Sequence, residues 1–108
     1  MKKYQTEISG HLDIFVADHE DEFEGEKTKW QDVLIHGDTE GLKSFAALLI
    51  SIADLNQDDI KDLPIGAREH IHLQPGFDIS KSSVEVIVGR IDAKGTGTFY
   101  DRYVEKEL

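Results

Sequence analysis

An acidic stretch near the N-terminus is the feature that most constrains how this chain can fold. Residues 4 to 26 contain eight carboxylates and no lysine or arginine. The carboxylates are Glu7, Asp13, Asp18, Glu20, Asp21, Glu22, Glu24 and Glu26. The densest part, residues 18 to 26, cannot be buried, because unpaired charges are costly to remove from water. It is therefore expected to be a loop or the solvated tip of a hairpin.

The segments on both sides of this acidic run have the alternating pattern of strands. Before it, one side of the pattern is apolar or weakly polar: Tyr4, Thr6, Ile8, Leu12, Ile14 and Val16. Gly10 interrupts the alternation and indicates a bulge or bend. After it, residues 30 to 36 place Val33 and Ile35 on one face and Trp30 and Leu34 on the other. A strand, an acidic connection and a second strand predict an antiparallel hairpin.

Residues 38 to 55 have the pattern of a helix. Asp38 or Thr39 can accept a hydrogen bond from the free amides of the first turn, and Glu40 suits the positive end of the helix. The apolar residues then recur at helical spacing: Leu42, Phe45, Ala46, Leu49, Ile52 and Ala53, with Leu48 and Ile50 widening the stripe. We expect this helix to lie across a sheet with Leu49 buried.

Two further segments have strand patterns. Residues 69 to 74 place Ile71 and Leu73 on the inner face, and Pro75-Gly76 closes the segment. Residues 84 to 91 are β-branched and apolar on both faces, which is typical of a central strand. Residues 98 to 104 are expected to form an edge strand or an extended tail. The prediction is a single α+β domain over residues 1–108, in β-β-α-β-β order. One main helix packs on a mainly antiparallel sheet of four or five strands.

The distribution of charge limits the class of partner. The chain has 22 acidic residues against 12 lysines and arginines, and residues 4 to 26 carry −8 of its net charge of −10. A concentrated negative surface excludes nucleic acid and anionic membranes as partners and favours a basic protein surface. The residues hypothesised to bind that partner are Asp18, Glu20, Asp21, Glu22, Glu24 and Glu26. They do not have the register of a twelve-residue calcium loop.

The N-terminus and the apolar segments predict a cytoplasmic protein. Met1-Lys2-Lys3 is followed by alternating residues rather than by the apolar run of a signal peptide. The longest apolar stretch, residues 45 to 50, is too short to span a bilayer.

His70 and His72 are the strongest candidates for metal ligands. Two residues apart on a strand, their imidazoles point to the same side. A third ligand would have to come from His36, Glu69 or Asp78. The favoured interpretation is that Ile71 and Leu73 face the core while both histidines lie on the wetter face. No cofactor is therefore expected, and a small metal-binding protein is the alternative.

Other motifs do not combine into a catalytic centre. Gly95-Thr96-Gly97 after Lys94 has the composition of a phosphate-binding loop, but no helix pattern follows it. Ser80, Ser82 and Ser83 lack the strained turn of a G-x-S-x-G nucleophile. The chain is therefore predicted not to be an enzyme.

Several segments together resemble a family of small bacterial proteins. They are His36–Ser44 leading into the apolar helix, His70–Pro75, Ser80–Ser83 and Val86–Arg90. Across about residues 36 to 97 they are similar to immunity proteins of polymorphic toxin systems. The resemblance implies a cytosolic α+β protein that protects its producer by binding a cognate toxin, often a nuclease.

The charge supports the same interpretation independently. Nucleases need lysines and arginines to hold phosphate backbones, and an inhibitor that presents carboxylates to such a surface blocks it without chemistry. The remaining alternative is an acidic housekeeping domain whose charge aids only solubility.

Overall fold

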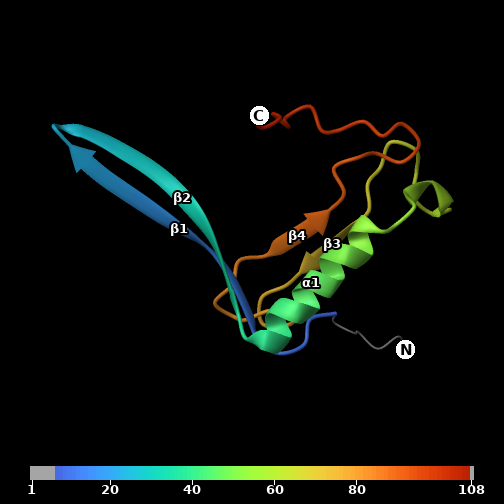
Figure 1. The fold of residues 1–108 in the computed structure, drawn as a ribbon, viewed down its shortest axis with the longest axis horizontal. Helices are drawn as coiled ribbons and strands as arrows, with labels where there is room; N and C mark the ends of the chain where they lie inside the picture. The colour runs from blue at the N-terminus through green and yellow to red at the C-terminus, as the bar shows by residue number, and fades with distance from the viewer. Residues whose placement is uncertain (1–6, 108) are drawn as a thin grey trace.

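The structure is a computed structural model that describes residues 7–107. The elements follow the order β1 (Leu12–Phe23), β2 (Glu26–Gly37), α1 (Thr39–Ala53), the 3-10 turn η1 (Gln57–Asp59), β3 (His70–Leu73) and β4 (Val86–Gly89). β1 and β2 project as a long ribbon from a body that contains the other elements (Figure 1), and the molecule measures 57 × 34 × 26 Å. We call residues 12–37 the arm, residues 18–32 the outer arm, and the remainder the body.

Within residues 7–107, the four strands form two separate antiparallel sheets of two strands each, β1–β2 and β3–β4. The prediction of one sheet of four or five strands is therefore wrong. The segment before β4 does reach the edge of β1, where the amides of Ser80 and Val84 donate to the carbonyls of Leu12 and Ile14, both at 2.9 Å. However, the amide of Ile14 donates to the hydroxyl of Ser83 at 3.0 Å. A side chain thus takes the place of a backbone carbonyl, and the ladder does not continue.

β4 is shorter and less central than its composition predicts. It spans Val86–Gly89 rather than residues 84 to 91, and it pairs only with β3. His70 lies opposite Gly89 and Leu73 opposite Val86. Ile87 is exposed, so one face of this small sheet is open to solvent. The apolar character of this segment on both faces therefore did not indicate a central strand.

The core lies between α1, the base of β1 and the β3–β4 sheet. Its buried members are Ile8, Leu12, Ile14, Leu48, Ile52, Leu73 and Ile79. The helix predicted within residues 38 to 55 is confirmed as α1, but Leu49 is 41% exposed, so its predicted burial is wrong. A two-stranded sheet is too narrow to cover more than one stripe of a helix. That stripe runs through Gly41, Phe45, Leu48 and Ile52, and the other apolar side chains of α1 face outward.

The junction between β1 and α1 is built around Asp38. Its Oδ1 atom accepts from the amide of Gly41 at 2.8 Å, which confirms the predicted cap, and from the amide of His11 at 3.1 Å. These two amides hold the pKa of the Asp38 carboxyl below its ordinary value. Gly10 has a φ of +69°, a left-handed conformation that glycine adopts readily, and it forms the bend that the sequence indicated.

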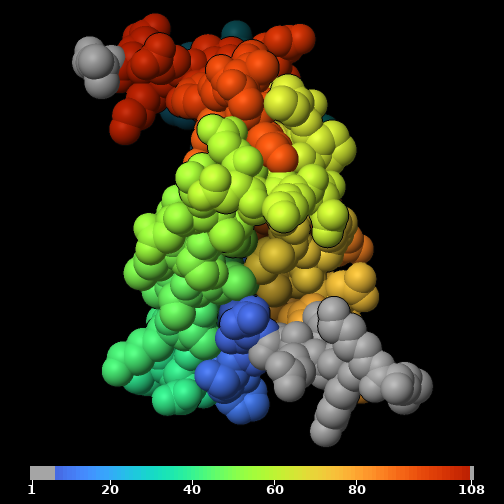
Figure 2. Space-filling view, turned by 90° about the vertical axis from the view of Figure 1, so that its right-hand side faces the viewer, coloured from blue at the N-terminus to red at the C-terminus, as the bar shows by residue number. Residues whose placement is uncertain are grey.

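The two ends of the chain differ from the predicted strands. The expected first strand included Tyr4 and Thr6, which lie outside the described residues, and β1 begins only at Leu12. Of the two alternatives expected for residues 98 to 104, an edge strand or an extended tail, the edge strand does not form. In Figure 2 the C-terminal segment, in red, lies across one end of the body. Within residues 7–107, no helix has the length and apolar character needed to cross a membrane.

Candidate functional site: the acidic arm

The acidic run forms a regular β-ribbon. β1 and β2 pair along their full length, from Leu12 opposite Gly37 to Phe23 opposite Glu26. Glu24 and Gly25 close the ribbon with φ values of 52° and 83°. Two positive φ angles are typical of a type I′ turn, whose twist matches that of paired strands. The predicted hairpin is confirmed, but most of the run is strand rather than loop, and the second strand begins at Glu26 rather than Trp30.

The six carboxylates hypothesised to bind a partner all lie on the outer arm and are exposed. The outer arm carries seven carboxylates against two lysines, Lys27 and Lys29, and its net charge is therefore −5. Ile14, near the base of the arm, is the core residue closest to the tip of the ribbon. The outer arm therefore contributes little to the body's packing, and its carboxylates face solvent.

One face of the outer arm pairs its acids with lysines. Residues directly opposite each other in an antiparallel pair share a face, and here Glu20 is opposite Lys29 and Glu22 is opposite Lys27. Lys27 Nζ also lies 3.4 Å from Glu20 Oε1. We call this the lysine face, and it consists of Asp18, Glu20, Glu22, Lys27, Lys29 and Gln31. Its three carboxylates and two lysines leave a net charge of −1.

The opposite face is aromatic and has no lysine. Its members are His19, Asp21, Phe23, Glu26, Thr28, Trp30 and Asp32, and we call it the aromatic face. The rings of His19 and Trp30 stack, with centroids 5.2 Å apart and planes 19° apart. His19 Nε2 lies 3.0 Å from Asp32 Oδ2. Three carboxylates and no lysine or arginine therefore surround a pair of stacked rings.

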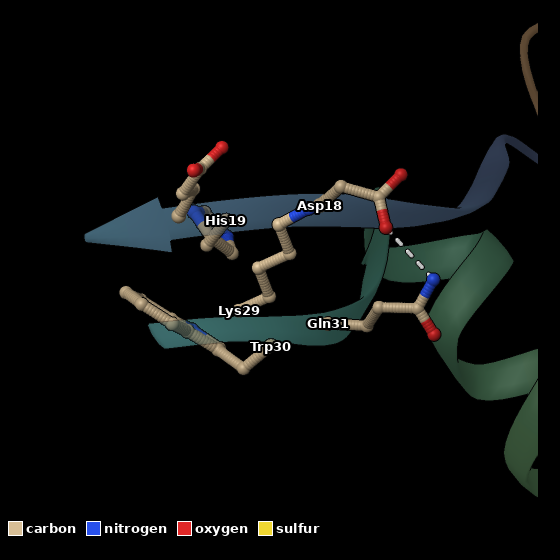
Figure 3. Close-up of a pocket in the computed structure, with 6 residues that line it drawn as sticks. Asp18, His19, Lys29, Trp30 and Gln31 are labelled. Carbon is tan, nitrogen blue, oxygen red and sulfur yellow. Dashed lines mark hydrogen bonds between the residues drawn. The ribbon is translucent and has the colours of Figure 1, made fainter. Parts of the chain in front are cut away.

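A hollow of about 530 Å³ lies beside the middle of the outer arm. Its lining comes from both faces of the ribbon: Asp18, His19, Glu20, Lys29, Trp30 and Gln31. Figure 3 shows Gln31 reaching across to Asp18, to which its Nε2 donates at 2.7 Å. A two-stranded ribbon cannot enclose a small molecule, because it has no second wall. The hollow is therefore an open surface feature rather than an enclosed cavity.

The two candidate metal ligands lie on the exposed face of β3. Ile71 is half-buried and Leu73 is buried while His70 and His72 are exposed, which confirms the predicted facing of this strand. His72 Nδ1 lies 3.1 Å from Glu85 Oε1, and His70 Nδ1 lies 3.1 Å from the carbonyl of Arg68. Across residues 7–107, no three side chains of the ligand types are grouped so that they could hold a metal ion.

The serines considered as nucleophiles fasten the segment before β4 to the base of the arm. Ser80 Oγ and Ser82 Oγ donate to Asp13 Oδ1 at 2.6 and 2.7 Å, and Ser83 Oγ donates to it at 3.3 Å. The hydroxyls of Ser80 and Ser82 hold the pKa of the Asp13 carboxyl below its ordinary value. This cluster fixes where the arm leaves the body.

The segment considered as a phosphate loop is engaged by the body. Lys94 Nζ donates to the carbonyls of Ile60 and Leu63, and the amide of Gly95 donates to Asp58 Oδ1 at 2.8 Å. A carboxylate thus occupies the position where a phosphate would bind. The geometry gives no support to nucleotide binding here.

Sequence reasoning missed four residues of the arm: Phe23, Lys27, Lys29 and Trp30. The acidic stretch ends at Glu26, directly before Lys27. A signal was present, however. Glu20 and Glu22 precede Glu24-Gly25 at the same spacings at which Lys29 and Lys27 follow it, as a two-residue hairpin turn requires for cross-strand pairs.

Comparison with known proteins gives one match. The model of a family described as Immunity protein 32 matches residues 32–91. No curated protein and no solved structure matches the chain. The matched segment starts within β2 and includes α1, β3 and β4, so it covers most of the body. The match also supports the resemblance seen across about residues 36 to 97. Most of the outer arm lies outside it.

Proposed function

This chain belongs to the Immunity protein 32 family, and we propose on that basis that it neutralises a cognate toxin by binding it through the acidic arm. Membership of an immunity protein family implies that the partner is a toxin. The family match, however, rests mainly on the body and does not name the binding surface. The proposal that the arm contacts the toxin is supported by the arm's charge, exposure and shape.

The observation that carries the proposal is the net charge of −5 on a projecting ribbon. Charges held away from the body are not cancelled by its lysines and arginines, so their field extends into solvent. Such a field speeds encounter with a basic surface and acts over about a Debye length, roughly 8 Å at physiological salt. We therefore propose that the toxin presents lysines and arginines to the arm.

The proposed mechanism is occlusion, with no chemistry performed by this chain. A nuclease toxin must hold the phosphate backbone in a basic groove. The arm is narrow, exposed on both faces and rich in carboxylates, so it can enter such a groove in place of the substrate. The complex then forms in the cytoplasm of the producing cell, before the toxin reaches its substrate.

Association kinetics test this proposal. The ligand is the toxin encoded beside this chain's gene, carrying a substitution that inactivates it. Changing Glu20, Glu22 and Glu24 to Gln changes the net charge of the outer arm from −5 to −2. We expect slower association and a weaker dependence of its rate on salt. The free energy of unfolding should hardly change, because exposed carboxylates contribute little to stability.

A matched control removes three exposed acids from the C-terminal segment: Asp101, Glu105 and Glu107. This control has the same total charge as the arm variant, but its association rate should stay close to that of the parent. Equal association rates for parent, control and arm variant at two salt concentrations would contradict the proposed role of the arm.

A further inference from the structure

We infer that the toxin docks on the aromatic face of the outer arm, with Trp30 and Phe23 as anchors and with Asp21 and Glu26 as the charges that contact it. This inference rests on the proposed function, because it assigns a face to the binding surface proposed above. It requires a partner that has an apolar recess bordered by lysines or arginines.

The first support is the exposure of large aromatic side chains. Phe23 is 75% exposed and Trp30 is 44% exposed, and neither is among the core residues or those that pack against them. Large apolar side chains gathered on one exposed surface indicate an interaction site. A two-stranded ribbon alone in water is also only marginally stable. Covering this face with a partner stabilises the arm as well as the complex.

The second support is the difference in charge pairing between the two faces. Glu20 and Glu22 lie opposite lysines, so a partner that contacts them must also accommodate Lys29 and Lys27. Asp21 lies opposite Thr28, and Glu26 lies opposite Phe23. Among residues 7–107, no lysine or arginine forms an ion pair with Asp21 or Glu26. A basic partner therefore gains more on the aromatic face.

The third support is that three side chains of the aromatic face already contact one another in the protein alone. Asp32 holds the imidazole of His19 at 3.0 Å, and His19 in turn stacks against Trp30. Fixing side chains before binding lowers the entropy that binding costs. Tryptophan is also among the residues that most often dominate binding energy at protein interfaces. Trp30 thus combines partial exposure with a fixed orientation.

The association rate and the dissociation rate should depend on different features of the arm. Steering depends on the total charge of the arm, whichever face carries it, whereas the lifetime of the complex depends on the groups in contact. Two charge-matched variants exploit this difference. One changes Asp21 to Asn and Glu26 to Gln on the aromatic face. The other changes Glu20 and Glu22 to Gln on the lysine face.

Both variants should associate with the inactivated toxin more slowly than the parent does, and their association rates should be similar. Only the aromatic-face variant should also dissociate faster. Faster dissociation of the lysine-face variant alone, or equal changes in the dissociation rates of both, would overturn the inference. If neither variant changes either rate while the toxin still binds, the proposed role of the arm fails as well. The two failures are therefore distinguishable.

Truncating apolar side chains provides a second measurement. Trp30→Ala should raise the dissociation rate at least about 30-fold, equivalent to about 2 kcal/mol. The matched control is Val33→Ala, because Val33 is 65% exposed and its side chain points to the other side of the ribbon. Its dissociation rate should change less than about threefold. A larger effect for Val33→Ala than for Trp30→Ala would contradict the assignment of the face.

Discussion

The backbone carbonyl of His11 lies so close to Gly41 that a β-carbon at position 41 would stand 1.8 Å from the carbonyl oxygen. This contact brings the start of α1 against the residue that precedes β1. In the same place Asp38 accepts from the amides of both His11 and Gly41. The base of the arm is thereby held to the helix by backbone packing that only glycine permits.

Gly41→Ala should therefore destabilise the protein, although alanine is the better helix former by about 1 kcal/mol. The added methyl group must displace the His11 backbone, and overpacking of this kind costs roughly 1–3 kcal/mol. Urea unfolding measures the change. Lys43→Ala, at an exposed position of the same helix, is the control. An alanine at position 41 that leaves stability unchanged or raises it would refute the close packing.

Leu48 and Leu49 provide the second prediction, because the helix buries one and exposes the other. Leu48→Ala should cost about 2–5 kcal/mol, the usual cost of a cavity in a packed core. Leu49→Ala should cost less than about 1 kcal/mol, because most surface substitutions have small effects. The measurement is again the free energy of unfolding in urea. A larger loss for Leu49→Ala would reverse the assignment of the buried stripe.

These two leucines also show what could be predicted from the sequence. Local sequence patterns correctly placed the hairpin, the helix, its cap at Asp38 or Thr39 and the outward histidines of β3, because each depends on neighbours along the chain. They did not show which side of an apolar helix is buried, since Leu48 and Leu49 differ only in what packs against them. Nor did they show that Ser83 would replace a backbone carbonyl opposite Ile14 and leave two small sheets.

The candidate site likewise combines features that local composition reveals with features that depend on strand pairing. The acidic residues were located from local composition, but their pairing with Lys27 and Lys29 depends on the register of the ribbon. That register places each charge on one face or the other, and no count of charges along the chain reveals it. The contact between His19 and Asp32 on the aromatic face likewise depends on the strands being paired.

The hydrogen bonds of Asp13 predict how the stability of the protein changes with pH. Its pKa is held below the ordinary value of 3.8 by the hydroxyls of Ser80 and Ser82. A carboxyl with a depressed pKa stabilises the folded state above its ordinary pKa, and this contribution is lost as the pH falls through the lower, folded value. We compare the parent with Asp13→Asn by thermal unfolding. The difference in melting temperature should be constant above about pH 5, since an unperturbed Asp is ionised there.

Below pH 3.8 the difference between these two proteins should shrink as Asp13 becomes protonated in the parent. Asp38 and Asp92 also have a lowered pKa, Asp92 because the Arg90 side chain donates to its carboxyl. Both are present in both proteins, so their own titration cancels in the comparison. A difference that grows on acidification would contradict the inferred direction of the pKa shift.

His70 and His72 are predicted to hold no tightly bound metal. Their Nδ1 atoms already have partners in Arg68 and Glu85, and a stable site needs a third ligand. Protein purified without an affinity tag and then desalted should contain far less than one transition metal per chain. A chelator should leave its melting temperature unchanged. Stoichiometric zinc, nickel or iron that is lost on changing both histidines to alanine would contradict this prediction.

Shortening the arm tests the central claim most directly. Val16 lies opposite Val33, so residues 17 to 32 can be replaced by Asn-Gly, a pair that favours a two-residue type I′ turn. The buried residues Leu12 and Ile14 are retained, and the melting temperature should stay close to that of the parent. The dissociation constant for the inactivated toxin is the decisive measurement. We predict that it rises at least about 1,000-fold, equivalent to about 4 kcal/mol; a folded, shortened chain that binds within threefold of the parent would contradict the account.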